Sequence, residues 1–209
     1  MTSSVLARSF AAAGFFAMAA LVAAAACSAR VPTTHYYVLE SRAAPVEAPP
    51  ASGAVVGVRP FRVDPPYDQD RIVYRVDGES AEIGFYAYHR WAAPLERMLP
   101  GVVASAYSGV PGARSIEPMT SGRNYDAFMR GRVLAFEEID APGGPRVRVH
   151  LTLRLHASDG TELWSATLSR DADVLSKDVG DVVEQMRSAL ADAIRESRPN
   201  LQSALQASH

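Results

Sequence analysis

The chain has 209 residues, with 21 Lys and Arg against 23 Asp and Glu, for a formal net charge of −2. This length allows one folded domain and a short tail, and 48% apolar against 21% charged residues excludes wholesale disorder. The nearly balanced charge gives no electrostatic basis for nucleic-acid binding, which draws mainly on a cationic surface. A single cysteine excludes an internal disulfide framework and a cysteine-rich metal site.

The N-terminal residues have the pattern of a secretory signal peptide, which we assign to residues 1–26. Arg8 is the one charged residue before an uninterrupted apolar stretch from Phe10 to Ala26. The alternative is a permanent membrane anchor. The 17 residues of this stretch would reach only about 25 Å as a helix, which is short of the hydrocarbon core of about 30 Å. The sequence therefore favours a segment that is removed after export.

Cys27, the sole cysteine, follows that stretch directly. The segment Leu21–Cys27 resembles a bacterial lipobox, in which a small residue precedes a cysteine that is acylated and becomes the first mature residue. It departs from that pattern at Ala24, where Leu is usual. The resemblance implies that acyl chains on Cys27, palmitate among them, hold the protein at a membrane, with about 0.8 kcal/mol from each buried methylene. The alternative is an ordinary signal-peptidase cut after Ala26.

Ser28 is the residue that would sort such a lipoprotein. In sorted lipoproteins, Asp directly after the acylated cysteine commonly retains the protein in the inner membrane. Ser28 is uncharged, so the same resemblance implies residence in the outer membrane, on its periplasmic face.

The mature chain opens with a lipidated tether at residues 27–34, and the folded domain is expected over residues 35–199. Residues 43–53 within it are rich in Pro and Ala, which is typical of an extended linker. Apolar residues from Leu95 to Ala106 form a helical stripe, which Pro100-Gly101 is expected to kink or split. Strands are expected in this half over His35–Leu39 and Val55–Val63, and Pro60 must lie at the end of the second strand, on an edge or at a bulge. A hairpin is expected in which Arg71–Val76 pairs with Ile83–Tyr88 across a turn at Asp77-Gly78.

Strict alternation over Arg146–Ala157 is the clearest pattern in the chain. Every second residue from Val147 onward is apolar and the residues between are polar, which predicts a strand with one buried face. The other elements expected here are strands over Ser115–Pro118 and Tyr125–Ile139, a hairpin partner over Glu162–Ser169 across Asp159-Gly160, a helix over Asp178–Ser197 that Pro199 ends, and a C-terminal tail over residues 200–209. This order predicts an α+β or open α/β fold, with two main helices packed on a mixed, mostly antiparallel sheet.

Several short motifs follow the order and spacing of one known family. They are HYYVL at His35–Leu39, VGVRPFRV at Val56–Val63, Pro66-Tyr67, DRIVYR at Asp70–Arg75, HRWAAPL at His89–Leu95, RGRV at Arg130–Val133, and Trp164. From Cys27 to about Ser197 the chain resembles the ABC-type transport auxiliary lipoproteins. It departs from their pattern at Ala93, where an acidic residue is usual.

This resemblance implies a lipid-anchored, non-catalytic periplasmic component of an envelope transport system for lipids, with phospholipid as a ligand. The partner implied is an MCE-domain protein of an ABC transporter system. A homo-oligomer is also implied, because relatives form rings. Two alternatives stay open: a lipoprotein that scaffolds envelope assembly without a transporter, and a periplasmic hydrolase.

The sequence contains no recognisable catalytic or metal-binding signature. The five histidines have no metal-ligand spacing, and neither a nucleophile elbow nor a phosphate-binding glycine loop occurs. Asp64, Asp68 and Asp70 cluster, but they lack the Gly and Glu of a calcium loop, so a solvated turn is expected. A catalytic triad assembled in space stays open as an alternative. We therefore expect a protein that is not an enzyme, and we assign no cofactor, metal ligand or catalytic residue.

The polar face of the alternating strand carries Arg146, Arg148 and Arg154, with Arg130 or Arg132 expected on the neighbouring strand. Guanidinium groups bind carboxylates and phosphates, so this face is the candidate surface for an acidic partner or for lipid phosphates. The alternative is a solvated sheet face without a partner.

Acylation of Cys27 is directly testable. We expect labelled palmitate to enter the wild-type protein and not a Cys27→Ser variant, because the thiol is the group that the lipobox resemblance assigns to acylation. Metabolic labelling followed by immunoprecipitation measures this, and Ser28→Ala, which keeps the cysteine, should label like the wild type. Equal labelling of Cys27→Ser and wild type would overturn the assignment.

Overall fold

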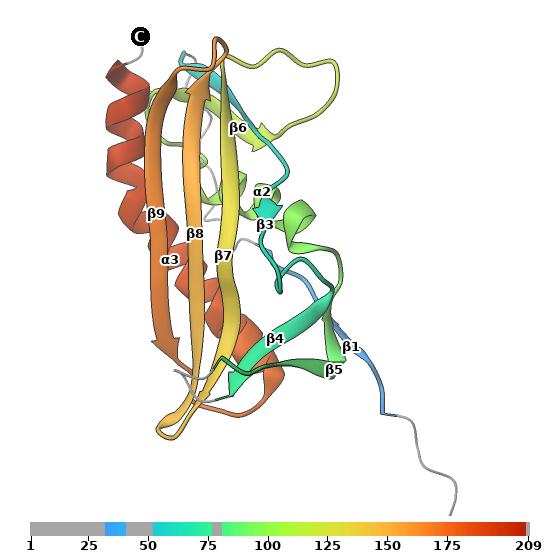
Figure 1. Ribbon diagram of the computed structural model, residues 1–209. Helices are drawn as coiled ribbons and strands as arrows, with labels where there is room; N and C mark the ends of the chain where they lie inside the picture. The colour runs from blue at the N-terminus through green and yellow to red at the C-terminus, as the bar shows by residue number, and fades with distance from the viewer. Residues whose placement is uncertain (1–31, 41–51, 77–80, 208–209) are drawn as a thin grey trace, which may run out of the picture. The chain divides into compact units, whose positions relative to one another are not determined.

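The computed structural model describes residues 32–40, 52–76 and 81–207 (Figure 1). Cys27, Ser28 and most of the expected linker at residues 43–53 lie outside these ranges. The described elements all lie in one unit, Thr34–His209. In chain order they are β1 (His35–Tyr37), β2 (Ala54–Val58), β3 (Arg62–Val63), β4 (Arg71–Val76), β5 (Ile83–Trp91), α2 (Leu95–Ala106), β6 (Ala113–Pro118), β7 (Ala127–Ala141), β8 (Gly144–Ala157), β9 (Glu162–Asp173) and α3 (Val179–Ala207). Neither described helix combines the length and the apolar character needed to cross a membrane.

The described strands form one open, mixed sheet built around β7. Three short strands, β2, β3 and β4, pair in parallel with successive stretches along one edge of β7. On its other edge β7 pairs antiparallel with β8, and β8 with β9. The sheet continues from β4 to β5 in antiparallel pairing, and then from β5 to β1 in parallel. The longest registers are antiparallel and two helices pack on the sheet, so the expected fold class is confirmed.

The alternation over residues 146–157 is confirmed in β8. Its apolar side chains are fully buried: Val147, Val149, Leu151, Leu153 and Leu155. Figure 1 shows α3 crossing behind β7, β8 and β9, and the inward side chains of α3 complete this core. Each fully buried aliphatic side chain contributes about 1.5–3 kcal/mol. The polar side chains of β8 project from the opposite face of the sheet.

The single strand expected over Val55–Val63 is two strands, β2 and β3, and Pro60 lies between them because it has no N–H to donate to a ladder. The N–H of Arg59 donates to the carbonyl of Met129 at 3.0 Å, and the N–H of Asp64 donates to that of Val133 at 3.1 Å. Both carbonyls belong to β7. The chain therefore stays aligned with β7 on either side of the proline.

Of the kink or split expected at Pro100-Gly101, the split is wrong, because α2 is one helix from Leu95 to Ala106. Proline removes the bond that position 100 would donate to the carbonyl of Glu96, four residues earlier. In this fold the N–H of Phe61 donates to that carbonyl at 3.2 Å. A bond from the β2–β3 connection thus replaces the one that the helix loses.

The expected helix end before Pro199 is also wrong, because α3 continues to Ala207 and includes the segment expected as a tail. Leu201 and Leu205, beyond the proline, are fully buried. Arg198 donates to backbone carbonyls at the C-terminal end of α2. Two buried leucines, at about 1.5–3 kcal/mol each, offset the roughly 3 kcal/mol that a proline costs inside a helix.

Two glycines give opposite predictions for stability. A Cβ on Gly131 would lie 2.2 Å from the buried ring of Phe61, whereas a Cβ on Gly101 would meet nothing within 4 Å. We expect Gly131→Ala to lower the free energy of unfolding by about 1–3 kcal/mol through overpacking. Gly101→Ala should raise it by about 0.4–1 kcal/mol, because the unfolded chain loses freedom. Urea unfolding measures both, and a Gly131→Ala protein as stable as the wild type would contradict this packing.

Candidate functional site

The structure places Arg146, Arg148 and Arg154 on one face of β8, as the alternation predicts, and sets acids of β9 beside them. Arg146 lies opposite Asp173 in the strand register, with Nε 2.8 Å from Oδ1. Arg148 lies opposite Asp171 and donates to both of its carboxylate oxygens, at 3.2 and 3.0 Å. Arg154 approaches the glutamate that begins β9, at 3.7 Å. The face therefore carries alternating charge and is not a purely cationic patch.

The arginines expected on the neighbouring strand are also on this face of the sheet. Arg130 pairs in register with Arg154 on β8, and Arg132 donates to both carboxylate oxygens of Asp64, with its shortest bond 2.7 Å. The bonds from Arg132 lower the pKa of the Asp64 carboxyl. Asp70, in the same expected turn, accepts a bond of 2.7 Å from Arg90. Within the described ranges no group of three His, Cys, Asp or Glu side chains could hold a metal ion.

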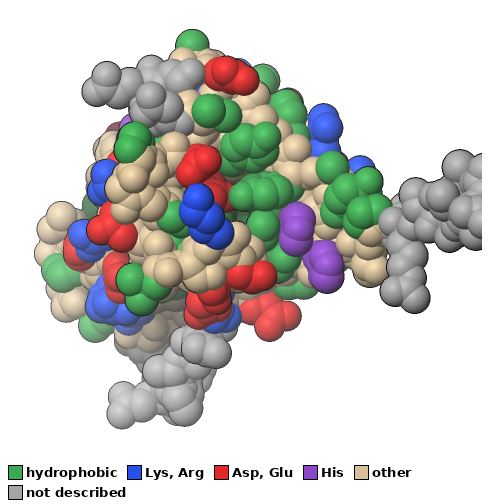
Figure 2. Space-filling model, turned by 90° about the horizontal axis from the view of Figure 1, so that it is seen from below, with side chains coloured by type: hydrophobic (Ala, Val, Ile, Leu, Met, Phe, Trp, Pro, Cys, Tyr) green, Lys and Arg blue, Asp and Glu red, His purple; other side chains and the backbone are tan. Residues whose placement is uncertain are grey.

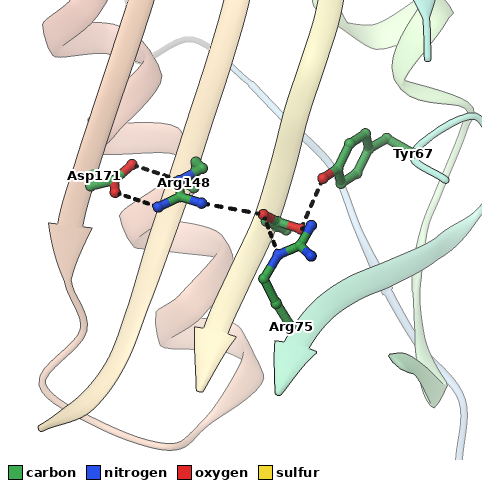
Figure 3. A network of polar contacts seen from close by, with 5 residues as sticks. Tyr67, Arg75, Arg148 and Asp171 are labelled. Carbon is green, nitrogen blue, oxygen red and sulfur yellow. Dashed lines mark hydrogen bonds and ion pairs between the residues drawn. The ribbon is translucent and has the colours of Figure 1, made fainter. Parts of the chain in front are cut away.

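A buried carboxylate, Glu137 of β7, joins this charged face to β4 and to the loop before it (Figure 3). Arg75 donates two bonds to it, from Nε to Oε1 at 3.1 Å and from Nη2 to Oε2 at 3.0 Å. The hydroxyl of Tyr67 donates to Oε2 at 2.8 Å. Arg148 lies 3.9 Å from Oε1 while it holds Asp171 on its other side. The result is a row of alternating charges that crosses β9, β8, β7 and β4.

The central charge of this row, the carboxylate of Glu137, is buried, and its partners offset the free-energy cost of that burial. Glu137 is 1% exposed, and taking a carboxylate out of water costs several kcal/mol unless it is paired and hydrogen-bonded. Burial, together with its bond to Glu137, raises the pKa of Tyr67 to about 12. The hydrogen bond to Glu137 raises the pKa of Arg75, and the bond to Asp171 raises that of Arg148. All of these residues satisfy one another, so the network positions the strands. Arg146 and Arg154 are more exposed than Arg148.

Sequence reasoning missed four members of this network: Tyr67, Arg75, Glu137 and Asp171. Two of them could have been found, since antiparallel pairing across Asp159-Gly160 sets Asp171 opposite Arg148, and antiparallel pairing across the turn between β7 and β8 sets Glu137 opposite Arg148. The other two, Tyr67 and Arg75, depend on the parallel pairing of β4 with β7, which joins segments about 60 residues apart. No local pattern in the sequence indicates that pairing.

Comparison with known proteins agrees with this fold. The sequence profile of the ABC-type transport auxiliary lipoprotein component family matches residues 37–196. The crystal structure of a protein from Xanthomonas campestris superposes with a TM-score of 0.68 at 22% identity, over 83% of this chain and 98% of that chain. A second crystal structure, of a protein described only as uncharacterized, gives 0.62 at 16% identity, over 81% and 99%. At these identities the likeness shows the fold alone. No curated protein matches the chain.

An open mixed sheet with two helices, matched over most of its length by one profile, defines a class of envelope lipoproteins that accompany transport systems. The chain belongs to the family of ABC-type transport auxiliary lipoprotein components. The family resemblance drawn from the short motifs is thereby confirmed. Membership indicates a lipoprotein component of the cell envelope that is held at a membrane.

Removing one guanidinium from the buried network should cost far more than removing an exposed one. We expect Arg75→Met to lower the free energy of unfolding by about 3 kcal/mol or more, because Glu137 stays buried without its bidentate partner. Arg154→Met, which changes a side chain that is 63% exposed, should shift it by about 0.5 kcal/mol at most. Urea unfolding at pH 7 compares the two, and equal losses would contradict the role given to Glu137.

Proposed function

We propose that this protein is a lipid-anchored, non-catalytic component of an envelope lipid transport system, and that it binds an MCE-domain partner near the outer membrane. The observation that carries the proposal is the family match over residues 37–196, which associates the chain with ABC-type transport. Phospholipid is the transported class that fits this proposal. The charged groups on the open face of the sheet pair with one another, and this favours a role in binding a partner over a role in catalysis.

The anchor in this proposal is acylated Cys27, and Ser28 permits sorting to the outer membrane, on its periplasmic face. The seven residues from Ser28 to Thr34 reach about 25 Å at full extension. A domain on so short a tether stays close to its membrane. Contact across the periplasm therefore needs a partner that extends from the inner membrane.

The surface proposed for that partner is the open face of β8 and β9, with Arg146, Arg148 and Arg154 at its centre. Arg146 and Arg154 are 46% and 63% exposed and can exchange their present partners for acids of another protein. Arg148 is held between Glu137 and Asp171, so it shapes the surface while the other two reach out from it. Complementary charge of this kind sets the orientation and the rate of association more than the affinity.

Co-purification from detergent-solubilised membranes tests this function. We expect the full-length lipoprotein to recover an MCE-domain protein, and a double charge reversal, Arg146→Glu with Arg154→Glu, to reduce the recovery severalfold. Glutamates at these two positions would repel an acidic surface of the partner, whereas exposed substitutions shift the stability of the fold by only about 0.5 kcal/mol each.

The matched control reverses two exposed arginines on the helices, Arg97→Glu with Arg195→Glu, and should leave the recovery unchanged. Undiminished binding by the Arg146 and Arg154 variant would show that this face is not the partner surface. Recovery of no transporter component by the wild type would overturn the transport function itself.

A further inference from the structure

A second group of polar side chains lines an open pocket of about 460 Å³ where β4, β5 and β7 meet the loop that leads into α3. Its walls include three aromatic rings, of Tyr74, Phe85 and Tyr86. Its charged groups are Glu138, Asp140 and Lys177. Figure 2 views this end of the sheet and shows acidic and basic side chains next to a band of hydrophobic ones. The pocket is separate from the arginines of β8.

Glu138 is the unusual member of this pocket. It is 5% exposed, and among the described residues its hydrogen bond comes from the hydroxyl of Tyr86, at 2.7 Å. Its neighbour Glu137 has two arginines, whereas Glu138 has no ion pair within 4 Å in the part of the chain that the structure describes. Burial raises the pKa of the Glu138 carboxyl, and the bond from Tyr86 and the charge of Lys177 offset this only in part. A carboxylate buried with so little compensation leaves room for a cation from outside.

The sheet register explains why aromatic rings stand beside this carboxylate. Tyr74 lies opposite Glu138 on one side and opposite Gly84 on the other. A Cβ on Gly84 would lie 2.2 Å from Cζ of Tyr74, so the tyrosine ring occupies the space that a side chain would take. The rings of Tyr74 and Tyr86 lie 5.1 Å apart at 56°. Aromatic faces together with carboxylates are the chemistry that recognises an organic ammonium ion.

We propose that this pocket binds an organic ammonium group joined to a phosphate, as in phosphoethanolamine. The ammonium lies against Glu138, Asp140 and the tyrosine rings, and the phosphate pairs with Lys177. In this arrangement each charged group of the ligand lies next to a protein group of opposite charge. This inference adds a ligand site to the proposed transport function. It rests on that function only for the claim that the ammonium and the phosphate belong to a lipid.

The surroundings of the pocket favour a lipid as the source of this group. A neighbouring pocket of about 640 Å³ shares Pro145 and Lys177 with the first, and its lining includes Val174 and Leu175 together with the ion pair of Arg146 and Asp173. The side chain of Leu175 is fully exposed, and Val76, opposite Asp140 in the register, is 39% exposed. Apolar side chains beside the phosphate position would contact the first carbons of acyl chains.

Calorimetric titration of the full-length lipoprotein in dodecyl maltoside tests the ammonium site. We expect saturable binding of O-phosphoethanolamine and binding of inorganic phosphate that is at least tenfold weaker. Glu138→Gln keeps an acceptor for the hydroxyl of Tyr86 and removes the charge, so the affinity for O-phosphoethanolamine should fall about tenfold or more. Glu96→Gln, an exposed carboxylate on α2, is the matched control and should bind like the wild type.

Lys177→Gln provides a second test that does not depend on a buried residue. It should weaken O-phosphoethanolamine severalfold and leave ethanolamine unchanged, because only the phosphate contact is lost. No saturable binding by the wild type, equal affinity of Glu138→Gln and wild type for O-phosphoethanolamine, or equal binding of inorganic phosphate would each overturn the proposal.

Dihexanoyl phosphatidylethanolamine, titrated in the same way, distinguishes the two sources of the group. Tighter binding than that of O-phosphoethanolamine, weakened by Leu175→Ser, assigns the site to a lipid head group. Weaker binding assigns it to a soluble phosphoamine, and the ammonium site stands in either case. These titrations contain no transporter protein, so their failure is distinct from a failure to co-purify an MCE-domain partner.

Discussion

The bidentate bond between Arg75 and Glu137 is the interaction on which the assembly of this sheet depends. β4 reaches β7 through only four parallel register positions, and this ion pair lies at that junction. Tyr67 adds the loop before β4, and Arg148 carries the charge row onward to β8 and β9. A buried carboxylate is tolerated only with such partners, so the placement of the β4–β5 hairpin and the stability of the sheet are coupled.

A bulge in β7 determines which face of the sheet carries each of two adjacent glutamates, Glu137 and Glu138. The register shifts between Val133 and Ala135, and this reverses the facing of the residues that follow. Glu137 therefore lies beside Arg148 on the open face. Glu138 lies on the helix face, under the hydroxyl of Tyr86. One glutamate joins strands and the other lines a pocket, although the two are neighbours in the chain.

The two faces of the sheet consequently carry different kinds of side chain. The helices cover the apolar face and supply the core, and the face with the arginines of β8 displays paired charges. The aromatic rings and carboxylates of the pocket lie where β4, β5 and β7 meet the loop that leads into α3. The surface that we propose for a partner protein and the pocket that we propose for a head group thus belong to different faces of one sheet.

Sequence alone determined the features that depend on local periodicity: the alternation of Arg146–Ala157, the hairpin across Asp159-Gly160 and the apolar stripes of both helices. It also indicated the family through the order and spacing of short motifs, and the family match over residues 37–196 confirms this. Tertiary structure decided what depends on distant segments. Pro100 does not break α2 because Phe61 supplies the missing bond, and α3 passes Pro199 because Leu201 and Leu205 are buried. Arg75 likewise binds Glu137 although no local pattern indicates it, because burial and the parallel pairing of the remote strands β4 and β7 bring the two side chains together.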